Sequence, residues 1–396
     1  MCIRDRASEV AQGTAARARR TGDTVCEATL YYVQGEALWR QGDFPAARTQ
    51  LGRSLDLLRE EQATGKAIQA AREVETWALG SLGAAFWIHG DCEQGRAYLQ
   101  QALQIAQKDN DVRERSKLLA NLGVCAVEQG NYAQANELLQ QSLLIRQTMG
   151  DRRGEGITLG NLGNVFLYLG AYARAQVYYE QALHIQREIG ARNDQALSLG
   201  NLGLAHHYLG NNAAARALCR EGLQIGRETG EQRTQGALWM KMGHALEGLG
   251  QHDSAAKAYQ ESADIRRRQG WRDVVMEPLA GLAQVAMAQG DPGRAQEYVE
   301  EIWAHLQTGT LAGTVSPFQV YLTAYLVFKE SADPRAYQIL EAAHGELLER
   351  SAKIADIEMQ HSFLQNVQPH REIIREYALL MGAGQVPSPP SPPPSP

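Results

Sequence analysis

Three asparagines recur in this sequence at a fixed spacing: Asn121, Asn161 and Asn201 follow one another at intervals of 40 residues, each within the tripeptide Asn-Leu-Gly. Asparagine is a poor residue for the interior of a helix, because its short carboxamide competes for backbone hydrogen bonds. The same carboxamide offers both donors and acceptors, so it can form paired hydrogen bonds with the main chain of an extended peptide. The series therefore favours either hydrogen bonds to a bound peptide or hydrogen bonds between neighbouring helices.

The cysteines, the histidines and the Gly-Lys pair of this sequence do not have the spacing of any common catalytic or metal-binding site. The five cysteines lie tens of residues apart without a Cys-x-x-Cys pair, which argues against a zinc site or a disulfide framework. Cys125 and Cys219 fall on apolar helix faces, where a buried thiol is inert. His206 and His207 are adjacent, and consecutive helical positions point about 100° apart, so the two would not chelate one metal together. The segment 65–67 (Gly-Lys-Ala) lacks the hydroxyl residue and the upstream glycine of a phosphate-binding loop. We predict no catalytic residues, no metal and no cofactor.

Charge and hydropathy exclude two further classes of partner. The chain has 39 Lys+Arg against 45 Asp+Glu, a formal net charge of -6, which disfavours nucleic acid because that affinity depends on neutralising phosphates. The longest apolar stretch, about Tyr321–Phe328, is far shorter than the roughly 20 residues that span a bilayer. No apolar segment typical of a signal peptide follows Met1–Arg6. We therefore expect a cytoplasmic protein without a membrane partner.

Turn residues define the elements that must position the asparagines. Glycine ends a helix at low cost because it adopts the left-handed conformation, and asparagine does so more readily than most residues. Two helix-ending signals per 40 residues predict two helices per repeat. One series is Gly90, Gly130, Gly170, Gly210, Gly250 and Gly290, and the other, half a period away, is Asn110, Gly150, Gly190, Gly230 and Gly270.

A glycine also recurs in the middle of the first helix of three successive repeats, at Gly123, Gly163 and Gly203. Glycine there costs roughly 1 kcal/mol relative to alanine, so its recurrence implies that the second helix packs closely against it. We expect three such contacts: Gly123 with Ala135, Gly163 with Ala175, and Gly203 with Ala215.

This pattern resembles the tetratricopeptide repeat, whose first helix reads large-x-x-Leu-Gly-x-x-aromatic and whose second reads Ala-x-x-x-aromatic-x-x-Ala. The resemblance covers about residues 27–308 as seven helix pairs, although the period of 40 exceeds the usual value of about 34. The Leu-x-Asn-Leu-Gly core is similar to repeats of kinesin light chains and of bacterial regulators with tetratricopeptide sensor regions. It implies an all-α, right-handed superhelical α-solenoid. One repeat matches at Leu159, Leu162, Gly163, Phe166, Ala175, Tyr179 and Ala182.

The resemblance also implies which helix face meets a partner. First helices of such repeats line the concave side of the superhelix, and similar asparagines in related repeats hold peptide backbones. The alternative is that the asparagines bond to one another between neighbouring first helices and so set the superhelical twist; both can hold. The predicted peptide-binding groove comprises Asn121, Asn161, Asn164, Tyr168, Asn201, His207, Tyr208, Lys241 and His244.

The two ends of the chain depart from the repeat. Residues 1–26 are predicted as a half repeat, with the second helix of a truncated pair at about Arg6–Thr21 and its turn, and eight extra residues fall near Glu60–Ala70. Residues 309–380 are predicted as a helical cap on the solenoid, and residues 381–396, rich in proline and serine, as a disordered tail. Within the cap we expect helices at Pro317–Lys329, Pro334–Ser351 and Ala355–Leu380.

These features predict a scaffold or sensor array that binds an extended peptide or a partner domain, and not an enzyme. The stretch Ala336–Tyr377 is similar to the C-terminal ends of large bacterial signalling ATPases and cyclases that carry tetratricopeptide arrays. That similarity, with the half repeat, implies the recognition region of a larger bacterial signalling protein, with fusion to an upstream effector or ATPase domain. The alternative function is a small-molecule sensor whose ligand alters the superhelix and thereby an attached effector.

Overall fold

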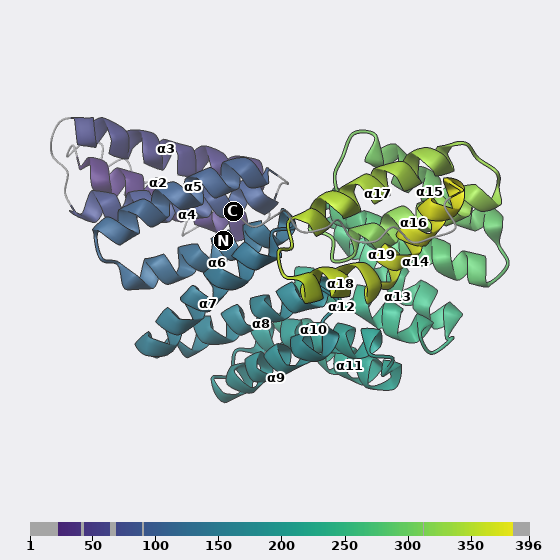
Figure 1. The fold of residues 1–396 in the computed structure, drawn as a ribbon. Coiled ribbons are helices and arrows are strands. Elements are labelled where there is room, and N and C mark those ends of the chain that lie inside the picture. Colours follow the sequence, from purple (N-terminus) through teal and green to yellow (C-terminus); the bar gives the residue numbers. More distant parts are fainter. Residues whose placement is uncertain (1–22, 41–42, 64–68, 89–90, 312, 383–396) are drawn as a thin grey trace, which may run out of the picture. The chain divides into compact units, whose positions relative to one another are not determined.

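The structure of this chain is a computed structural model, and it describes residues 23–40, 43–63, 69–88, 91–311 and 313–382. The regular elements of these residues are all α-helices (Figure 1). The half repeat expected at about Arg6–Thr21 and most of the tail expected at 381–396 lie outside them. The helices are α2 (Thr24–Arg40), α3 (Phe44–Ala63), α4 (Gln69–Ile88), α5 (Cys92–Lys108), α6 (Val112–Glu128), α7 (Tyr132–Met149), α8 (Arg152–Tyr168), α9 (Tyr172–Glu188), α10 (Arg192–Tyr208), α11 (Asn212–Thr229), α12 (Gln232–Glu247), α13 (His252–Arg268), α14 (Arg272–Ala288), α15 (Pro292–Leu306), α16 (Pro317–Glu330), α17 (Arg335–Ala352), α18 (Ile357–Gln365) and α19 (Gln368–Leu380).

Helices α2 to α15 are the seven predicted pairs, which confirms the helical solenoid. The chain divides into two compact units: unit 1 comprises residues 1–129 and 134–158, and unit 2 comprises residues 130–133 and 159–396. Within each unit the first helices of neighbouring pairs contact one another, α2 with α4 in unit 1 and α10 with α12 in unit 2. Direct contact between first helices is expected on the inner side of a curved stack, because helices crowd there and spread apart on the outer side.

The turn residues have the predicted backbone conformation. Asn110 has φ 55°, and the turn glycines from Gly130 to Gly290 all have positive φ, between 67° and 82°. Amide groups of these residues donate to carbonyls of the preceding helix, as in the bond from Gly170 to Leu167. The period of the solenoid is therefore set by residues that close each helix in the left-handed conformation.

The second helix also packs closely against the mid-helix glycines, but its nearest atoms belong to a different residue than the expected alanine. At all three glycines the second helix approaches most closely through the larger side chain four residues after the expected alanine, and at Gly123 and Gly203 the carbonyl oxygen of that alanine also lies near. A Cβ would lie 2.7 Å from Leu139 Cγ if added to Gly123, 2.5 Å from Tyr179 Cε1 if added to Gly163, and 3.0 Å from Cys219 Sγ if added to Gly203. Each glycine thus makes room for one side chain of its partner helix.

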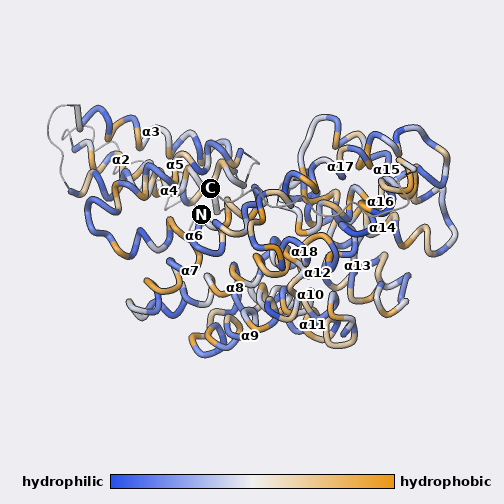
Figure 2. The backbone as a smooth tube through the Cα atoms, viewed as in Figure 1, coloured by the Kyte–Doolittle hydropathy of each residue, from blue (hydrophilic) through white to orange (hydrophobic). Residues whose placement is uncertain are grey.

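Apolar side chains alternate with polar ones along the helices of both units, as the hydropathy colouring of Figure 2 shows. In unit 1 the core cluster includes Leu51, Leu79 and Leu99, which come from α3, α4 and α5 and are all at most 1% exposed. Each helix therefore buries its apolar face against its immediate neighbours, as in other repeat proteins.

The extra residues of the first repeat lengthen its neighbouring helices. Helices α3 and α4 have 20 residues each, whereas α8 and α9 have 17. Residues 64–68 of this insertion lie outside the described residues.

The cap consists of α16 to α19, and α16 packs against α14 and α15 of the last repeats. The prediction of one helix at Ala355–Leu380 was wrong, because the segment forms two: α18 ends at Gln365 and α19 begins at Gln368. Pro369 lies in the first turn of α19. Proline has no backbone N–H and disfavours the helical conformation of the residue before it, so a helix starts here more readily than it continues.

Two glycines on α8 allow a direct test of this packing. A Cβ on Gly163 would overlap the ring of fully buried Tyr179, whereas a Cβ on Gly160 would meet nothing within 4 Å. We expect Gly163→Ala to lower the free energy of unfolding by about 1–3 kcal/mol through overpacking. Gly160→Ala should raise it by up to about 1 kcal/mol through helix propensity. Urea unfolding followed by circular dichroism measures both, and equal effects of the two substitutions would contradict the packing described here.

Candidate functional site

The predicted groove residues lie on the first helices of four consecutive pairs. Asn121 is on α6 in unit 1, where its side chain is exposed. The other eight belong to unit 2, and the structure brings most of them together. They are Asn161, Asn164 and Tyr168 on α8, Asn201, His207 and Tyr208 on α10, and Lys241 and His244 on α12.

Hydrogen bonds run between neighbouring first helices at the asparagine positions. Asn201 Nδ2 donates to Asn164 Oδ1 over 3.3 Å, and Lys241 Nζ donates to Asn201 Oδ1. Asn164 Oδ1 also accepts from the hydroxyl of Tyr179 at 2.7 Å. The nitrogen and the oxygen of the Asn201 carboxamide therefore both form hydrogen bonds to neighbouring first helices. This is the bonding expected under the alternative interpretation, in which the side chains bond to one another between helices, and we call this row of bonds the ladder. Asn161, in contrast, makes no side-chain hydrogen bond to any residue that the structure describes.

Lys241 continues the asparagine series, since it stands 40 residues after Asn201. Its side chain is only 7% exposed. Gly200 makes room for the stem, because a Cβ there would lie 3.3 Å from Lys241 Cδ. Burial lowers the pKa of Lys241 to about 8, and the nearby Cys219 and Glu277 oppose that shift. A buried amine with a pKa this close to neutrality loses its charge easily, and its hydrogen bond to Asn201 directs it toward the ladder.

Two imidazoles lie side by side next to this ladder. The rings of His207 and His244 stack with centroids 5.5 Å apart. His207 Nδ1 bonds to Asn212 Oδ1 at 2.7 Å, and His244 Nδ1 lies 3.0 Å from the hydroxyl of Tyr259. Burial lowers the pKa of His207, and it lowers that of His244 to about 3. Both rings are therefore neutral at pH 7, and each has one ring nitrogen committed to a neighbouring side chain.

Part of this helix face is covered by the chain's own C-terminal region. The hydroxyl of Tyr208 lies 3.0 Å from Ser316 Oγ. Glu277 Oε1 accepts two backbone hydrogen bonds of 3.0 Å, from the amides of Val315 and Ser316. Its other oxygen accepts from Arg266 Nη1 at 3.2 Å. The buried carboxylate of Glu277 on α14 and the hydroxyl of Tyr208 on α10 thus hold a stretch of non-helical main chain on these two first helices.

The end of α8 meets the cap in the same way. Tyr168 stacks on Tyr132, with ring centroids 6.2 Å apart, and Tyr132 lies 5.8 Å from the ring of Phe363 in α18. A Cβ on Gly170 would lie 2.9 Å from the carbonyl oxygen of Ser362. The cap therefore contacts the turn between α8 and α9 as well as α10.

Glu277 is the functional residue that the sequence prediction missed. It is the only carboxylate between Val274 and Ala288, in a stretch that is otherwise nearly all apolar. It is 3% exposed. A lone acid in an apolar helix needs partners when buried, and that signal could have identified it.

Reactive groups outside this face are few. Cys125 and Cys219 are buried, as predicted, and burial raises the pKa of each thiol to about 12, which leaves them protonated and unreactive. Among the described residues, no group of three or more His, Cys, Asp or Glu side chains is arranged to hold a metal ion. Within the same residues no helix has the length and hydropathy to cross a membrane.

Comparison with known proteins identifies the repeats. The family model of the tetratricopeptide repeat matches residues 73–148, 114–188, 154–228 and 194–268. No curated protein matches the chain. A Rap protein solved in complex with competence and sporulation factor is similar in fold, with a TM-score of 0.58 and 13% identity over 90% of this chain and 99% of that one. The apo form of RapI gives a TM-score of 0.55 at 16% identity, over 72% of this chain and all of that one.

A third similar structure is a signal-transduction ATPase with numerous domains and a tetratricopeptide-repeat sensor, from Pyrococcus horikoshii. Its TM-score is 0.48 at 14% identity, over 90% of this chain and 54% of that one. The two Rap structures, at TM-scores above 0.5, share the fold of this chain. Repeats matched over residues 73–268 and a helical solenoid throughout the described pairs make this chain a member of the tetratricopeptide-repeat proteins.

Proposed function

We propose that this chain is a protein-interaction scaffold that binds an extended segment of a partner protein. The segment would bind on the surface formed by the first helices α8, α10, α12 and α14, which we call the first-helix face. The observation that carries the proposal is the bonding of the chain's own segment 313–316. Its backbone amides donate to Glu277, and Ser316 bonds to Tyr208. A helix face that holds one stretch of irregular main chain by side-chain hydrogen bonds has the chemistry to hold another.

The free carboxamide of Asn161 favours a second contact area in the same unit as this segment, and the free carboxamide of Asn121 favours a separate contact in unit 1. Asn161 is half-buried and Asn121 is exposed, and neither makes a side-chain hydrogen bond to a described residue. Each net hydrogen bond contributes only about 1 kcal/mol, so useful affinity requires several of these groups together with an aromatic anchor on the partner.

The finer parts of the proposal rest on the sequence. We propose a cytoplasmic protein that serves as the recognition region of a larger bacterial signalling protein, on the similarity of Ala336–Tyr377 to the ends of signalling ATPases and cyclases. A scaffold of this kind needs no catalytic group, so we expect the isolated chain to have no enzymatic activity.

Alanine substitutions separate binding from architecture. Against a peptide selected from a random display library on the full chain, Asn161→Ala should weaken binding by about five- to tenfold, since one hydrogen bond contributes about 1 kcal/mol. It should leave the thermal midpoint unchanged. Asn201→Ala removes two bonds of the ladder and should lower the midpoint. Isothermal titration and thermal unfolding measure the two effects, and unchanged affinity in Asn161→Ala would remove this residue from the binding face.

Lys241 provides a test by pH. Burial lowers the pKa of Lys241 from the ordinary value of 10.5 to about 8 in the folded protein. Burying the charged amine therefore costs stability, and this cost is complete below pH 8. The cost decreases as the pH rises above 8 and is absent above about pH 10.5, where the amine is neutral in the unfolded chain as well. Lys241→Met should therefore raise the free energy of unfolding at pH 7 by about 1–3 kcal/mol, allowing for the lost bond to Asn201. That gain should shrink as the pH rises from 8 to 10.

Urea unfolding at several pH values measures the difference between Lys241→Met and wild type. The exposed Lys257 on α13 provides the control, because Lys257→Met should give a small difference that does not vary over this range. A loss of stability in Lys241→Met that is equal at pH 7 and pH 10 would show that Lys241 carries no such charge penalty.

A further inference from the structure

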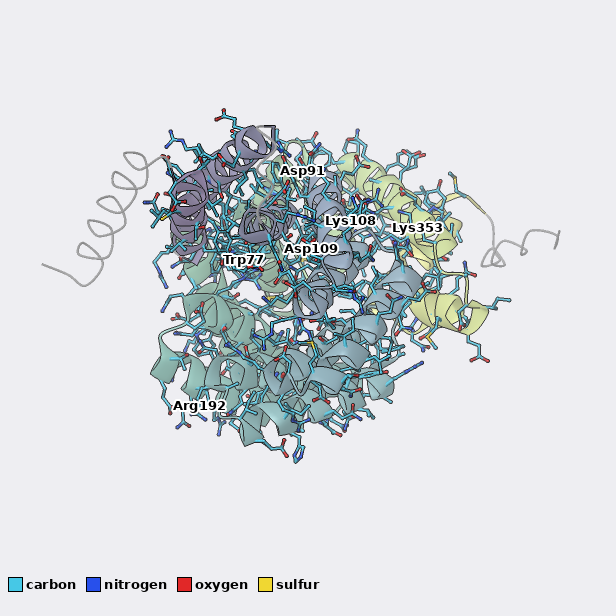
Figure 3. The ribbon with its side chains drawn as sticks, turned by 90° about the vertical axis from the view of Figure 1, so that its left-hand side faces the viewer. Trp77, Asp91, Lys108, Asp109, Arg192 and Lys353 are labelled. Carbon is cyan, nitrogen blue, oxygen red and sulfur yellow. The ribbon has the colours of Figure 1, made fainter. Side chains whose placement is uncertain are left out.

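A cavity of about 470 Å³ lies in unit 1, between the second helices α3 and α5 and above the first helix α4. Ligand sites commonly fall in the range of roughly 300–1,000 Å³. In Figure 3, which looks toward this unit, Asp91 marks the start of α5 and Asp109 its other end. The lining residues are Pro45, Arg48, Thr49, Gly52, Leu55, Asp56, Arg59, Leu82, Phe86 and Tyr98.

The cavity exists because one repeat lacks a side chain that the other pairs have. Gly52 is the ninth residue of α3, and a Cβ there would meet nothing within 4 Å. The six later pairs carry a long polar or charged residue at the same position. These are Gln100, Gln140, Glu180, Arg220, Gln260 and Glu300.

The floor of the cavity is apolar and its aromatic rings hold an arginine in place. Leu55 and Leu82 are at most 3% exposed. Phe86 stacks on Tyr98 with ring centroids 5.4 Å apart. The guanidinium carbon of Arg48 lies 4.1 Å from the centre of the Phe86 ring. A guanidinium held over a ring keeps its N–H groups at the edge, where they can form a paired contact with a carboxylate.

The same aromatic pair occurs in another repeat with its arginine placed differently. Phe166 and Tyr178 stack at 5.3 Å, and Arg174 lies 3.9 Å from the centre of the Phe166 ring. Arg174 belongs to α9, the helix that also carries Tyr178, whereas Arg48 reaches Phe86 from α3 of the preceding pair. Arg48 therefore stands at the rim of the gap between two second helices.

Positive charge dominates the rim. Arg48 and Arg59 are both exposed, and neither forms an ion pair with any carboxylate that the structure describes. Asp56, which lies between them on α3, is exposed and is not paired with either arginine. Arginines that have no carboxylate partner, beside an apolar cavity, suit a ligand that is apolar at one end and anionic at the other.

We propose that this cavity binds a carboxylate attached to an apolar group of about the size of an aromatic side chain. The apolar group occupies the space above Gly52, Leu55 and Leu82. The carboxylate lies at the rim against Arg48. This site is separate from the first-helix face, and it does not depend on the function proposed for that face.

Matched probes test the chemistry. N-acetyl-L-tryptophan carries the carboxylate, and N-acetyl-L-tryptophanamide is the same molecule without the charge. Saturation-transfer NMR and calorimetric titration on the full chain should detect the acid and give at least fivefold weaker binding for the amide. A third probe, the acetylated and amidated tripeptide Glu-Trp-Glu, presents the same chemistry within a peptide, and its affinity relative to the free acid distinguishes a peptide from a small metabolite as the source.

Substitutions locate the site. Gly52→Gln restores the side chain type found in the other repeats, so it should abolish binding of the acid without lowering the thermal midpoint. Gly345→Gln places the same residue at an exposed helical glycine of α17 with open space around it and should bind normally. Arg48→Gln should weaken binding of the acid at least fivefold and leave that of the amide unchanged. Absence of binding to all three probes, or binding that survives Gly52→Gln, would overturn the proposal.

Discussion

The architecture depends on one steric constraint, the close approach of the two helices within each pair. In six of the seven pairs a glycine of the first helix accepts the side chain that lies sixteen residues later, on the second helix, as Gly123 accepts Leu139 and Gly243 accepts Tyr259, whereas the last pair has Ala283 at this position. These contacts leave no space for a Cβ, so the depth of packing varies little from pair to pair. The fixed depth, together with the left-handed turn residues, keeps the period at 40 residues and brings equivalent positions of successive first helices next to one another.

Because equivalent positions lie next to one another, the residue types at these positions determine which hydrogen bonds the ladder contains. Position 161 and its equivalents carry Asn, Asn, Lys and Gly along α8, α10, α12 and α14. Asn201 bonds to both neighbouring helices, and Lys241 is held in the interior by one of these bonds. Gly281 ends the series because the ring of fully buried Tyr259 lies where a Cβ would be, 2.7 Å away. The groups left for a partner are therefore those at the start of the series.

Much of the solenoid could be predicted from the sequence, because residues at the same position of successive repeats occupy equivalent places in the structure. The turn conformation of Gly130, the pairing of Gly163 with its second helix and the placement of Asn201 on a first helix all follow from local pattern. The occupation of Asn201 by Lys241 does not, since it depends on the reach of one long side chain across a helix boundary. The C-terminal segment on Glu277 was also beyond prediction, because residues outside the repeat carry no period that fixes their position.

In a repeat protein, positions that agree in every repeat are explained by packing, and positions where one repeat differs require another reason. Gly163 and the equivalent glycines, present in six of the seven pairs, come close to the first group, and packing explains them whatever the chain binds. Gly52, Lys241 and Glu277 belong to the second: each departs from its equivalents, and each alters a cavity, a buried charge or the path of the main chain. An exchange of a whole unvaried repeat should therefore preserve the fold and lose little specificity, whereas single substitutions at these three positions act on recognition or on the energetics of one face alone.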